Sequence, residues 1–276
     1  MTPRKAPQPS RRDLLKWTAA GALTSLGTVS LGSFETGFLS VEHHELRLPN
    51  WDANGFKVAL LADLHTNSRL EAIHAANAVR AAMAETPDLI AIPGDFVNVG
   101  DPWHLAFVRQ SLEPLHEAKC PVIATLGNHD YECHDIHRLI DAVQSCSVKL
   151  LRNQAVEVQG VTVAGIDDGV WGKQRFDFLV KDNLSNSLLA LFHEPDFVKY
   201  VPTFVSLQLS GHSHGGQVCL PGGRPIHTPF GAWEYKVGYY PDAPVPLYVT
   251  RGVGTVGPRI RLFCRPEVTI LTLRAG

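Results

Sequence analysis

From about Val41 onward, short apolar runs typical of β-strands alternate with runs of helical periodicity, and this alternation most constrains the fold. Residues 156–158 and 161–166 flank Gln159-Gly160, which is typical of a hairpin turn. The whole pattern predicts an α/β fold. Strands are expected at residues 56–62, 88–93, 121–126, 188–192 and 205–210, and helices at about 69–85, 103–118 and 134–144.

The length and composition are those of one ordinary globular unit. A chain of 276 residues can form one large domain with a sizeable core, and it contains no internal repeat and no dividing linker. Residues 36–276 are therefore predicted to be a single domain. The net charge of -2 and the scattered basic residues argue against general nucleic-acid binding, which requires a basic face.

Residue types that commonly bind metal ions come directly after five of the predicted strands. Crevices beyond the carboxyl ends of strands are where open α/β sheets bind ligands. Residues two apart in extended backbone point to the same side, so each Asp-x-His or His-x-His pair is expected to aim two ligands at one place. The glycines at 94, 127 and 211 are expected to permit sharp turns. The groups are Asp63-Leu64-His65, Gly94-Asp95, Gly127-Asn128-His129-Asp130, His193 and Gly211-His212-Ser213-His214-Gly215.

These groups contain a set of carboxylate, imidazole and amide ligands that suits a divalent cation. Such a mixed set favours Mn, Fe or Zn over calcium, which prefers oxygen ligands alone. Seven candidates exceed the needs of one tetrahedral ion, whereas two ions about 3.5–4 Å apart can clamp both oxygens of a displacement at phosphorus. The candidate ligands are Asp63, His65, Asp95, Asn128, His193, His212 and His214.

The order of the motifs resembles that of the calcineurin-like metallophosphoesterase superfamily. D-x-H, G-D, G-N-H-D, a single H and G-H-x-H follow one another between Asp63 and His214, over more than half of the chain. The stretches from His193 to Asp196, from Gly211 to Gln217 and from Arg251 to Gly254 are similar to exported phosphodiesterases of the YaeI/YkuE type. The resemblance implies two β-sheets packed between helices, a four-layer αββα sandwich.

The resemblance also implies a role for each ligand. Asp63, His65 and His214 would hold one metal ion, and Asn128, His193 and His212 the other. Asp95 would bridge the two ions, and a metal-bridging hydroxide would attack the phosphate ester. His129 would stabilise charge or protonate the leaving oxygen, with Asp130 orienting its ring. The implied protein is a metal-dependent phosphoric ester hydrolase, most simply a phosphodiesterase.

Two other functions remain compatible with these motifs. One is hydrolysis of a lipid-linked pyrophosphate of the UDP-diacylglucosamine type, and the other is a non-catalytic metal-binding scaffold. His129 favours an enzyme, because a site that only binds metal has no chemical need for a proton donor. The sequence does not distinguish a wall-polymer diester, a pyrophosphate or a nucleotide as the substrate.

Several residues outside the motifs have two interpretations each. Arg251 lies in a glycine-rich loop, where it could bind phosphate or simply face solvent. Asp167 and Asp168 follow a β-run and favour a turn over additional ligands. His134 is the histidine nearest the catalytic turn and could line the pocket. The five cysteines have irregular spacing and do not predict a disulfide framework, although one pair could be bridged.

Residues 1–35 are predicted to be a targeting segment. Ser10-Arg11-Arg12-Asp13-Leu14-Leu15-Lys16 resembles a twin-arginine export signal, and the mild apolar run that follows is short for a membrane span. No clear Ala-x-Ala cleavage site follows, so an uncleaved segment would act as a membrane tether. We expect contact with the twin-arginine export machinery, and a location in the periplasm, at the outer face of the cytoplasmic membrane or in the cell wall.

Overall fold

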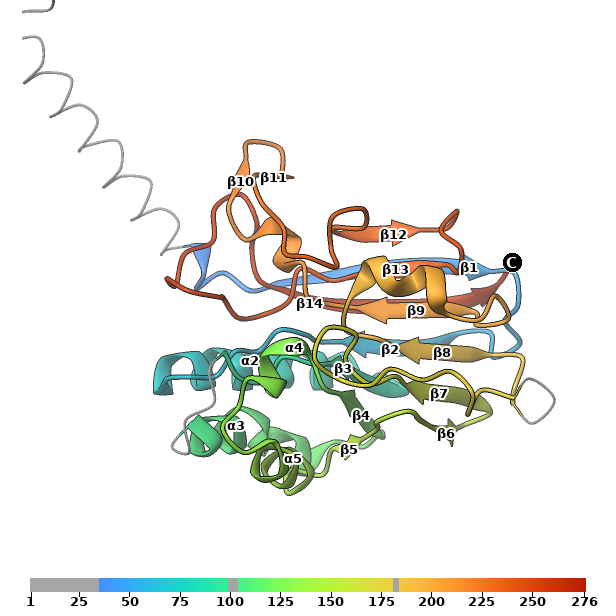
Figure 1. Cartoon of the computed structure of the whole chain (residues 1–276), viewed down its shortest axis with the longest axis horizontal. Coiled ribbons are helices and arrows are strands. Elements are labelled where there is room, and N and C mark those ends of the chain that lie inside the picture. Colours follow the sequence, from blue (N-terminus) through green and yellow to red (C-terminus); the bar gives the residue numbers. More distant parts are fainter. Residues whose placement is uncertain (1–34, 99–103, 181–183) are drawn as a thin grey trace, which may run out of the picture.

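The computed structural model describes residues 35–98, 104–180 and 184–276, which form two six-stranded β-sheets with helices (Figure 1). This arrangement confirms the predicted α/β class. The predicted targeting segment lies outside the described residues except for its last position. In the described ranges, no helix has the length and hydrophobicity needed to cross a bilayer.

The first sheet contains the strands that precede three of the metal-type motifs. Its order is β1-β14-β2-β3-β4-β5, and every neighbouring pair is parallel except β14 with β2. Buried β-branched and leucine residues dominate the central strands, as expected where both faces are covered. The bounds are β1 Ser40–Leu48, β2 Phe56–Leu60, β3 Leu89–Pro93, β4 Val122–Thr125, β5 Lys149–Leu150 and β14 Glu267–Ala275.

The second sheet precedes the other two motifs, and its order is β12-β13-β9-β8-β7-β6. Strands β7, β8, β9 and β13 are parallel, while β6 and β12 pair antiparallel at the two edges. The predicted hairpin at Gln159-Gly160 is confirmed, since Val158 pairs with Val161. The bounds are β6 Gln154–Val158, β7 Val161–Gly165, β8 Leu188–Leu191, β9 Leu207–Ser210, β12 Gly238–Tyr240 and β13 Leu247–Val249.

The two sheets pack face to face around an apolar core. Val58 and Leu89 of the first sheet belong to the same buried cluster as Leu189 and Leu207 of the second. Three α-helices cover the outer face of the first sheet, where they gather at the lower left of Figure 1. The outer face of the second sheet packs against a 3-10 helix, η3 (Pro195–Tyr200), and loops. The helices are α2 Arg69–Ala84, α3 His104–Leu112 and α5 Ile136–Gln144.

The helix bounds follow local chemistry. Ser68 caps α2 by accepting a hydrogen bond from the Glu71 amide. The helix predicted for 103–118 instead stops at Leu112 and continues as a 3-10 turn, η1 (Glu113–Glu117), because Pro114 has no amide hydrogen to donate. Two short elements had no periodic signal, namely α4 (Asn128–Tyr131) and the hairpin of β10 (Cys219–Leu220) with β11 (Arg224–Pro225).

Candidate metal centre

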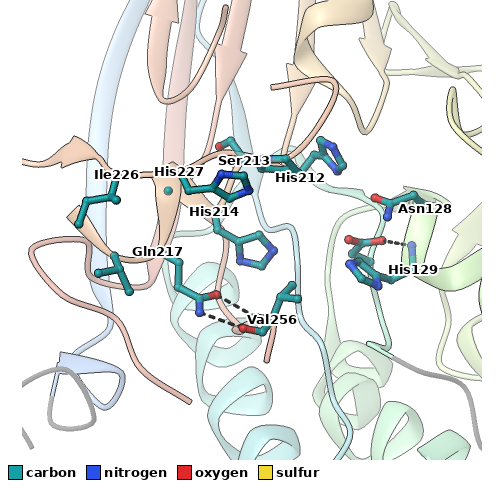
Figure 2. Close-up of a pocket in the computed structure, with 13 residues that line it drawn as sticks. Asn128, His129, His212, Ser213, His214, Gln217, Ile226, His227 and Val256 are labelled. Carbon is teal, nitrogen blue, oxygen red and sulfur yellow. Dashed lines mark hydrogen bonds between the residues drawn. The ribbon is translucent and has the colours of Figure 1, made fainter. Parts of the chain in front are cut away.

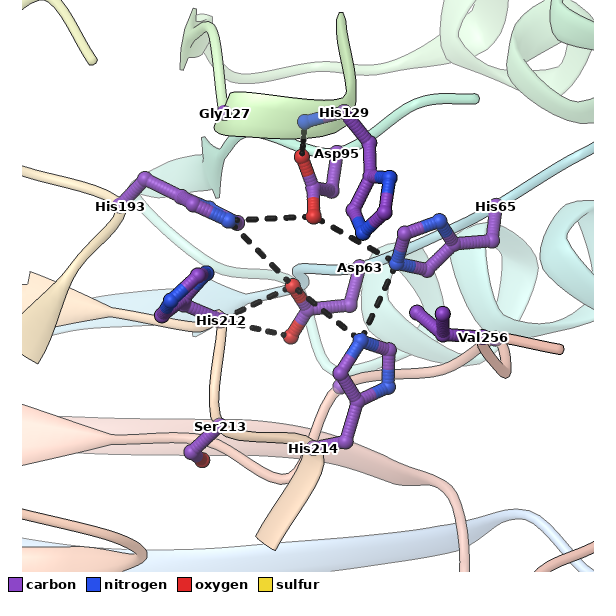
Figure 3. Close-up of polar contacts among 12 residues, drawn as sticks. Asp63, His65, Asp95, Gly127, His129, His193, His212, Ser213, His214 and Val256 are labelled. Atoms are coloured by element: carbon purple, nitrogen blue, oxygen red, sulfur yellow. Dashed lines mark hydrogen bonds and ion pairs between the residues drawn. The ribbon is translucent and has the colours of Figure 1, made fainter. Parts of the chain in front are cut away.

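All seven predicted ligands gather at the carboxyl ends of parallel strands from both sheets. Asp63 and His65 follow β2, Asp95 follows β3, and Asn128 follows β4. The second sheet supplies the remaining three ligands from the ends of β8 and β9, so the site lies where the two sheets meet (Figure 3). The three are His193, His212 and His214.

One group of four buried ligands surrounds a common point. Asp63, His65, Asp95 and His214 each offer one ligand atom, and these atoms all lie within 4.8 Å of one another. The Nε2 atom of His65 is 3.1 Å from Nε2 of His214 and 3.5 Å from Oδ2 of Asp95. Four ligand atoms this close can hold one divalent cation.

A second group shares Asp95 with the first. The ligand atoms of Asp95, His193 and His212 also lie within 4.8 Å of one another, with Nε2 of His193 3.1 Å from Oδ2 of Asp95. Asn128 lines a cavity together with Asp95 and His212, and its Oδ1 atom is buried with no hydrogen-bond partner in the described chain. A single carboxylate between two ligand groups is the arrangement that a bridge between two ions requires.

The backbone fixes which ring nitrogen of each histidine is free. Carbonyl oxygens only accept hydrogen bonds, so Nδ1 of His65 donates to Val97 at 3.2 Å and Nδ1 of His193 donates to Pro93 at 2.6 Å. Both residues then aim Nε2 at the carboxylate of Asp95. A positive charge is needed where these groups meet, and a divalent cation fits there because carbonyls orient metal-binding histidines in this way.

A hydrogen bond to a backbone carbonyl also orients His212, but through Nε2 instead of Nδ1. Its Nε2 atom donates to the carbonyl of Phe230 at 2.8 Å, which leaves Nδ1 as the nitrogen able to bind a cation. Burial lowers the pKa of His212 to about 4 and that of His65 to about 3, so both rings stay neutral and keep a lone pair at neutral pH.

The buried charges of the centre depend on one another. Burial raises the pKa of the Asp63 carboxyl to about 6. Although burial acts to lower the pKa of His193, the charges of Asp95 and Asp63 and a hydrogen bond that His193 donates to Asp95 raise it well above the ordinary value. Without a cation, therefore, a proton on His193 compensates these carboxylates, and a bound cation would replace that proton.

The ligand pairs reach one place by a backbone conformation that we had not predicted. Asp63, His65, His212 and His214 all have positive φ, between 46° and 67°, and so does Asp95 with φ 59°. The expectation of extended backbone is wrong. Left-handed backbone is costly for residues other than glycine, and such strain is commonly found at functional sites.

The three motif glycines also act differently from one another. Gly94 has φ 87° and makes the expected turn. Gly127 is extended, with φ -111° and ψ 178°, but a Cβ atom there would lie 2.3 Å from Oδ1 of Asp95. At Gly211 a Cβ atom would lie 2.8 Å from Oδ2 of Asp63. The second and third glycines are therefore needed for close approach of the ligands rather than for turning.

His129 lies beside the ligands, but Asp130 does not orient its ring. The Nδ1 atom of His129 bonds to the carbonyl of Asn98 at 3.0 Å and lies 3.2 Å from Oε2 of Glu132. The carboxylate of Asp130 instead accepts hydrogen bonds from backbone amides on both sides of the centre, so the predicted role of Asp130 is wrong and it fixes the ligand loops. These are the amides of Asp95, Phe96, Val97 and Gly127.

The structure shows the positions of three residues outside the motifs that had two interpretations each. Arg251 is held by ion pairs with Glu42 and, at 2.7 Å, Glu267, and its side chain is mostly buried rather than simply facing solvent. Asp168 accepts hydrogen bonds from the amides of residues 170–172, which confirms the turn. His134 is exposed and does not line the cavity, whereas His227 does.

One buried feature could not be predicted from the sequence. The guanidinium of Arg261 is fully buried and donates to the carbonyls of Arg251, Gly252, Gly254 and His214, which fixes the loops behind Asp63. A basic residue in an irregular segment gives no sequence signal of this kind. None of the five cysteines is bridged.

Comparison with known proteins agrees with this geometry and with the resemblance in the motifs. The family model described as calcineurin-like phosphoesterase matches residues 56–246. The phosphodiesterase YaeI of Escherichia coli (strain K12) is 32% identical over 272 residues, which cover 96% of this chain and 99% of that protein. The uncharacterized metallophosphoesterase YkuE of Bacillus subtilis (strain 168) is 29% identical, covering 96% and 98%. The chain therefore belongs to the calcineurin-like phosphoesterase family and is a metal-dependent phosphoric ester hydrolase.

Proposed function

We propose that this protein is a phosphodiesterase that holds two divalent cations, of Mn, Fe or Zn, at the described centre. The single observation that carries the proposal is the position of the Asp95 carboxylate, which belongs to both groups of ligand atoms. The name of the YaeI relative, a phosphodiesterase, supports the reaction class. When bound, such a pair of cations supplies positive charge on the phosphoryl oxygens and a water of lowered pKa.

The protein's own residues position the two cations and supply a proton. Asp63, His65 and His214 hold one cation, and Asn128, His193 and His212 hold the other, with Asp95 between them. His129 lines the cavity, and its Nδ1 atom is engaged by the Asn98 carbonyl. The Nε2 atom of His129 is therefore the nitrogen that gives a proton to the oxygen of the leaving alcohol.

Metal content and substrate range test this proposal. We expect the full chain to bind two ions, and the manganese-loaded protein to hydrolyse bis(p-nitrophenyl) phosphate faster than p-nitrophenyl phosphate. Preference for a nucleoside diphosphate-linked compound over the diester would instead favour the pyrophosphatase.

Replacing Asp95, the shared ligand, tests whether the centre holds two bridged ions. Asp95→Asn should lower metal content and turnover together, because a neutral amide is a weaker ligand for both ions. Asp168→Asn is the matched control, since Asp168 is also a buried carboxylate but belongs to neither ligand group. Two ions retained in Asp95→Asn would contradict the bridging role.

We also propose that the protein acts outside the cytoplasmic membrane after twin-arginine export, associated with the membrane or the cell wall. The support is the Ser10-Arg11-Arg12-Asp13-Leu14-Leu15-Lys16 sequence and the mild apolar run after it. Arg11→Lys combined with Arg12→Lys should retain the protein in the cytoplasm with its hydrolytic activity intact. Cell fractionation measures this, and normal export of the double variant would contradict the proposal.

A further inference from the structure

A cavity of about 390 Å³ extends from the metal ligands toward the hairpin of β10 and β11 (Figure 2). Asn128 and His129 lie at one end of it in this view, and Ile226 lies at the other. Four aliphatic side chains line the cavity, and in the described chain no Phe, Tyr or Trp side chain lines it. The four, which we call the aliphatic wall, are Val218, Ile226, Pro229 and Val256.

Two polar side chains that also line the cavity already form hydrogen bonds with the backbone. Gln217 accepts a hydrogen bond from the Val256 amide at 2.8 Å and donates one to the Val256 carbonyl at 3.0 Å, as Figure 2 shows. The hydroxyl of Ser213 donates to the Lys236 carbonyl and accepts from the Gly215 amide. Apart from His227, the wall therefore offers hydrocarbon to a bound molecule.

The wall begins beside the ligands and ends at the surface. Val256 lies next to His65 and His214 in Figure 3. Ile226, at the other end, leaves 63% of its surface exposed, so this end of the wall is open to a molecule that enters from solvent. A base or a sugar ring is usually recognised by aromatic stacking and directed hydrogen bonds. A wall that, apart from His227, offers neither of these suits a saturated chain.

We propose that the diester substrate carries an aliphatic chain on its retained oxygen, and that this chain packs on Val218, Ile226 and Val256. The proposal rests on the proposed function. Water oxygen forms the new bond to phosphorus, the bond to the other alcohol breaks beside His129, and that alcohol leaves with a proton. The product on the wall is the alkyl phosphate monoester.

Hydrolysis of p-nitrophenyl alkyl phosphates by the manganese-loaded full chain tests the proposal, with the alkyl group lengthened from methyl to hexyl. Each methylene that packs on the wall should raise kcat/KM about threefold, since full burial of one corresponds to about fourfold. Ile226→Ser and Val256→Thr should each flatten this rise, because they place a hydroxyl on the wall. The comparison is the hexyl-to-methyl ratio within each variant.

Leu220→Ser is the matched control, because Leu220 is an exposed residue of the same hairpin that does not line the cavity. It should leave the wild-type ratio unchanged. A flat series in the wild type, or an equal loss in Leu220→Ser and Ile226→Ser, overturns the aliphatic site while the phosphodiesterase stands. Absence of hydrolysis for every ester, methyl included, overturns the proposed function itself.

Discussion

Replacing Asp130 with asparagine should damage metal binding, although Asp130 is not a ligand. Its Oδ1 atom accepts from the amides of Phe96 at 2.8 Å and Val97 at 3.3 Å, and Oδ2 accepts from Gly127 at 3.0 Å and Asp95 at 2.9 Å. Whichever oxygen becomes an NH₂ group, two amides lose their acceptor. A buried amide left without an acceptor costs about 1–3 kcal/mol, so the loss of two acceptor contacts should cost about 2–6 kcal/mol.

This cost falls on the loop that carries Asp95 and on the turn that carries Asn128. We therefore expect Asp130→Asn to lower the free energy of unfolding in urea and to lose at least one of the bound ions, which elemental analysis would count. Asp168→Asn removes bonds within its own turn and should lower stability without metal loss. Full metal content and unchanged stability in Asp130→Asn would refute the reasoning.

Three further predictions concern other single residues. His129→Ala should retain both ions while kcat falls by roughly 10²–10⁴, and by less for a nitrophenolate leaving group; metal loss would make His129 a ligand. Arg261→Met should lower the urea unfolding free energy by about 3 kcal/mol or more, because buried carbonyls lose their donor; an unchanged value would contradict this. Burial lowers the pKa of His74 to about 4, so between about pH 6.5 and pH 4 the unfolded state binds a proton at His74 and the folded state does not. Stability should fall by about 2 kcal/mol at pH 5, and His74→Gln should remove that part of the pH dependence in urea titrations.

Much of the framework of this protein could be predicted from local sequence pattern. The apolar runs located β2, β3, β4, β8 and β9 to within a few residues, because a strand between two covered faces must be apolar along its length. Since parallel strands end at one edge, the residues that follow them were expected to meet there. The seven ligand types needed no tertiary information, because their chemistry is that of the side chains alone.

The tertiary structure decided how these residues are held. Arg251, which follows β13, lies 209 residues from Glu42 of β1, and their ion pair joins segments of the two sheets, which no local pattern specifies. The role of Asp130 likewise depends on the loop after β3 folding over it. The left-handed φ of Asp63 is strained in isolation and persists only because the packed loops impose it. Local periodicity reports how a segment meets the core, whereas hydrogen-bond partners and backbone strain are set by segments that become neighbours only when both sheets have packed.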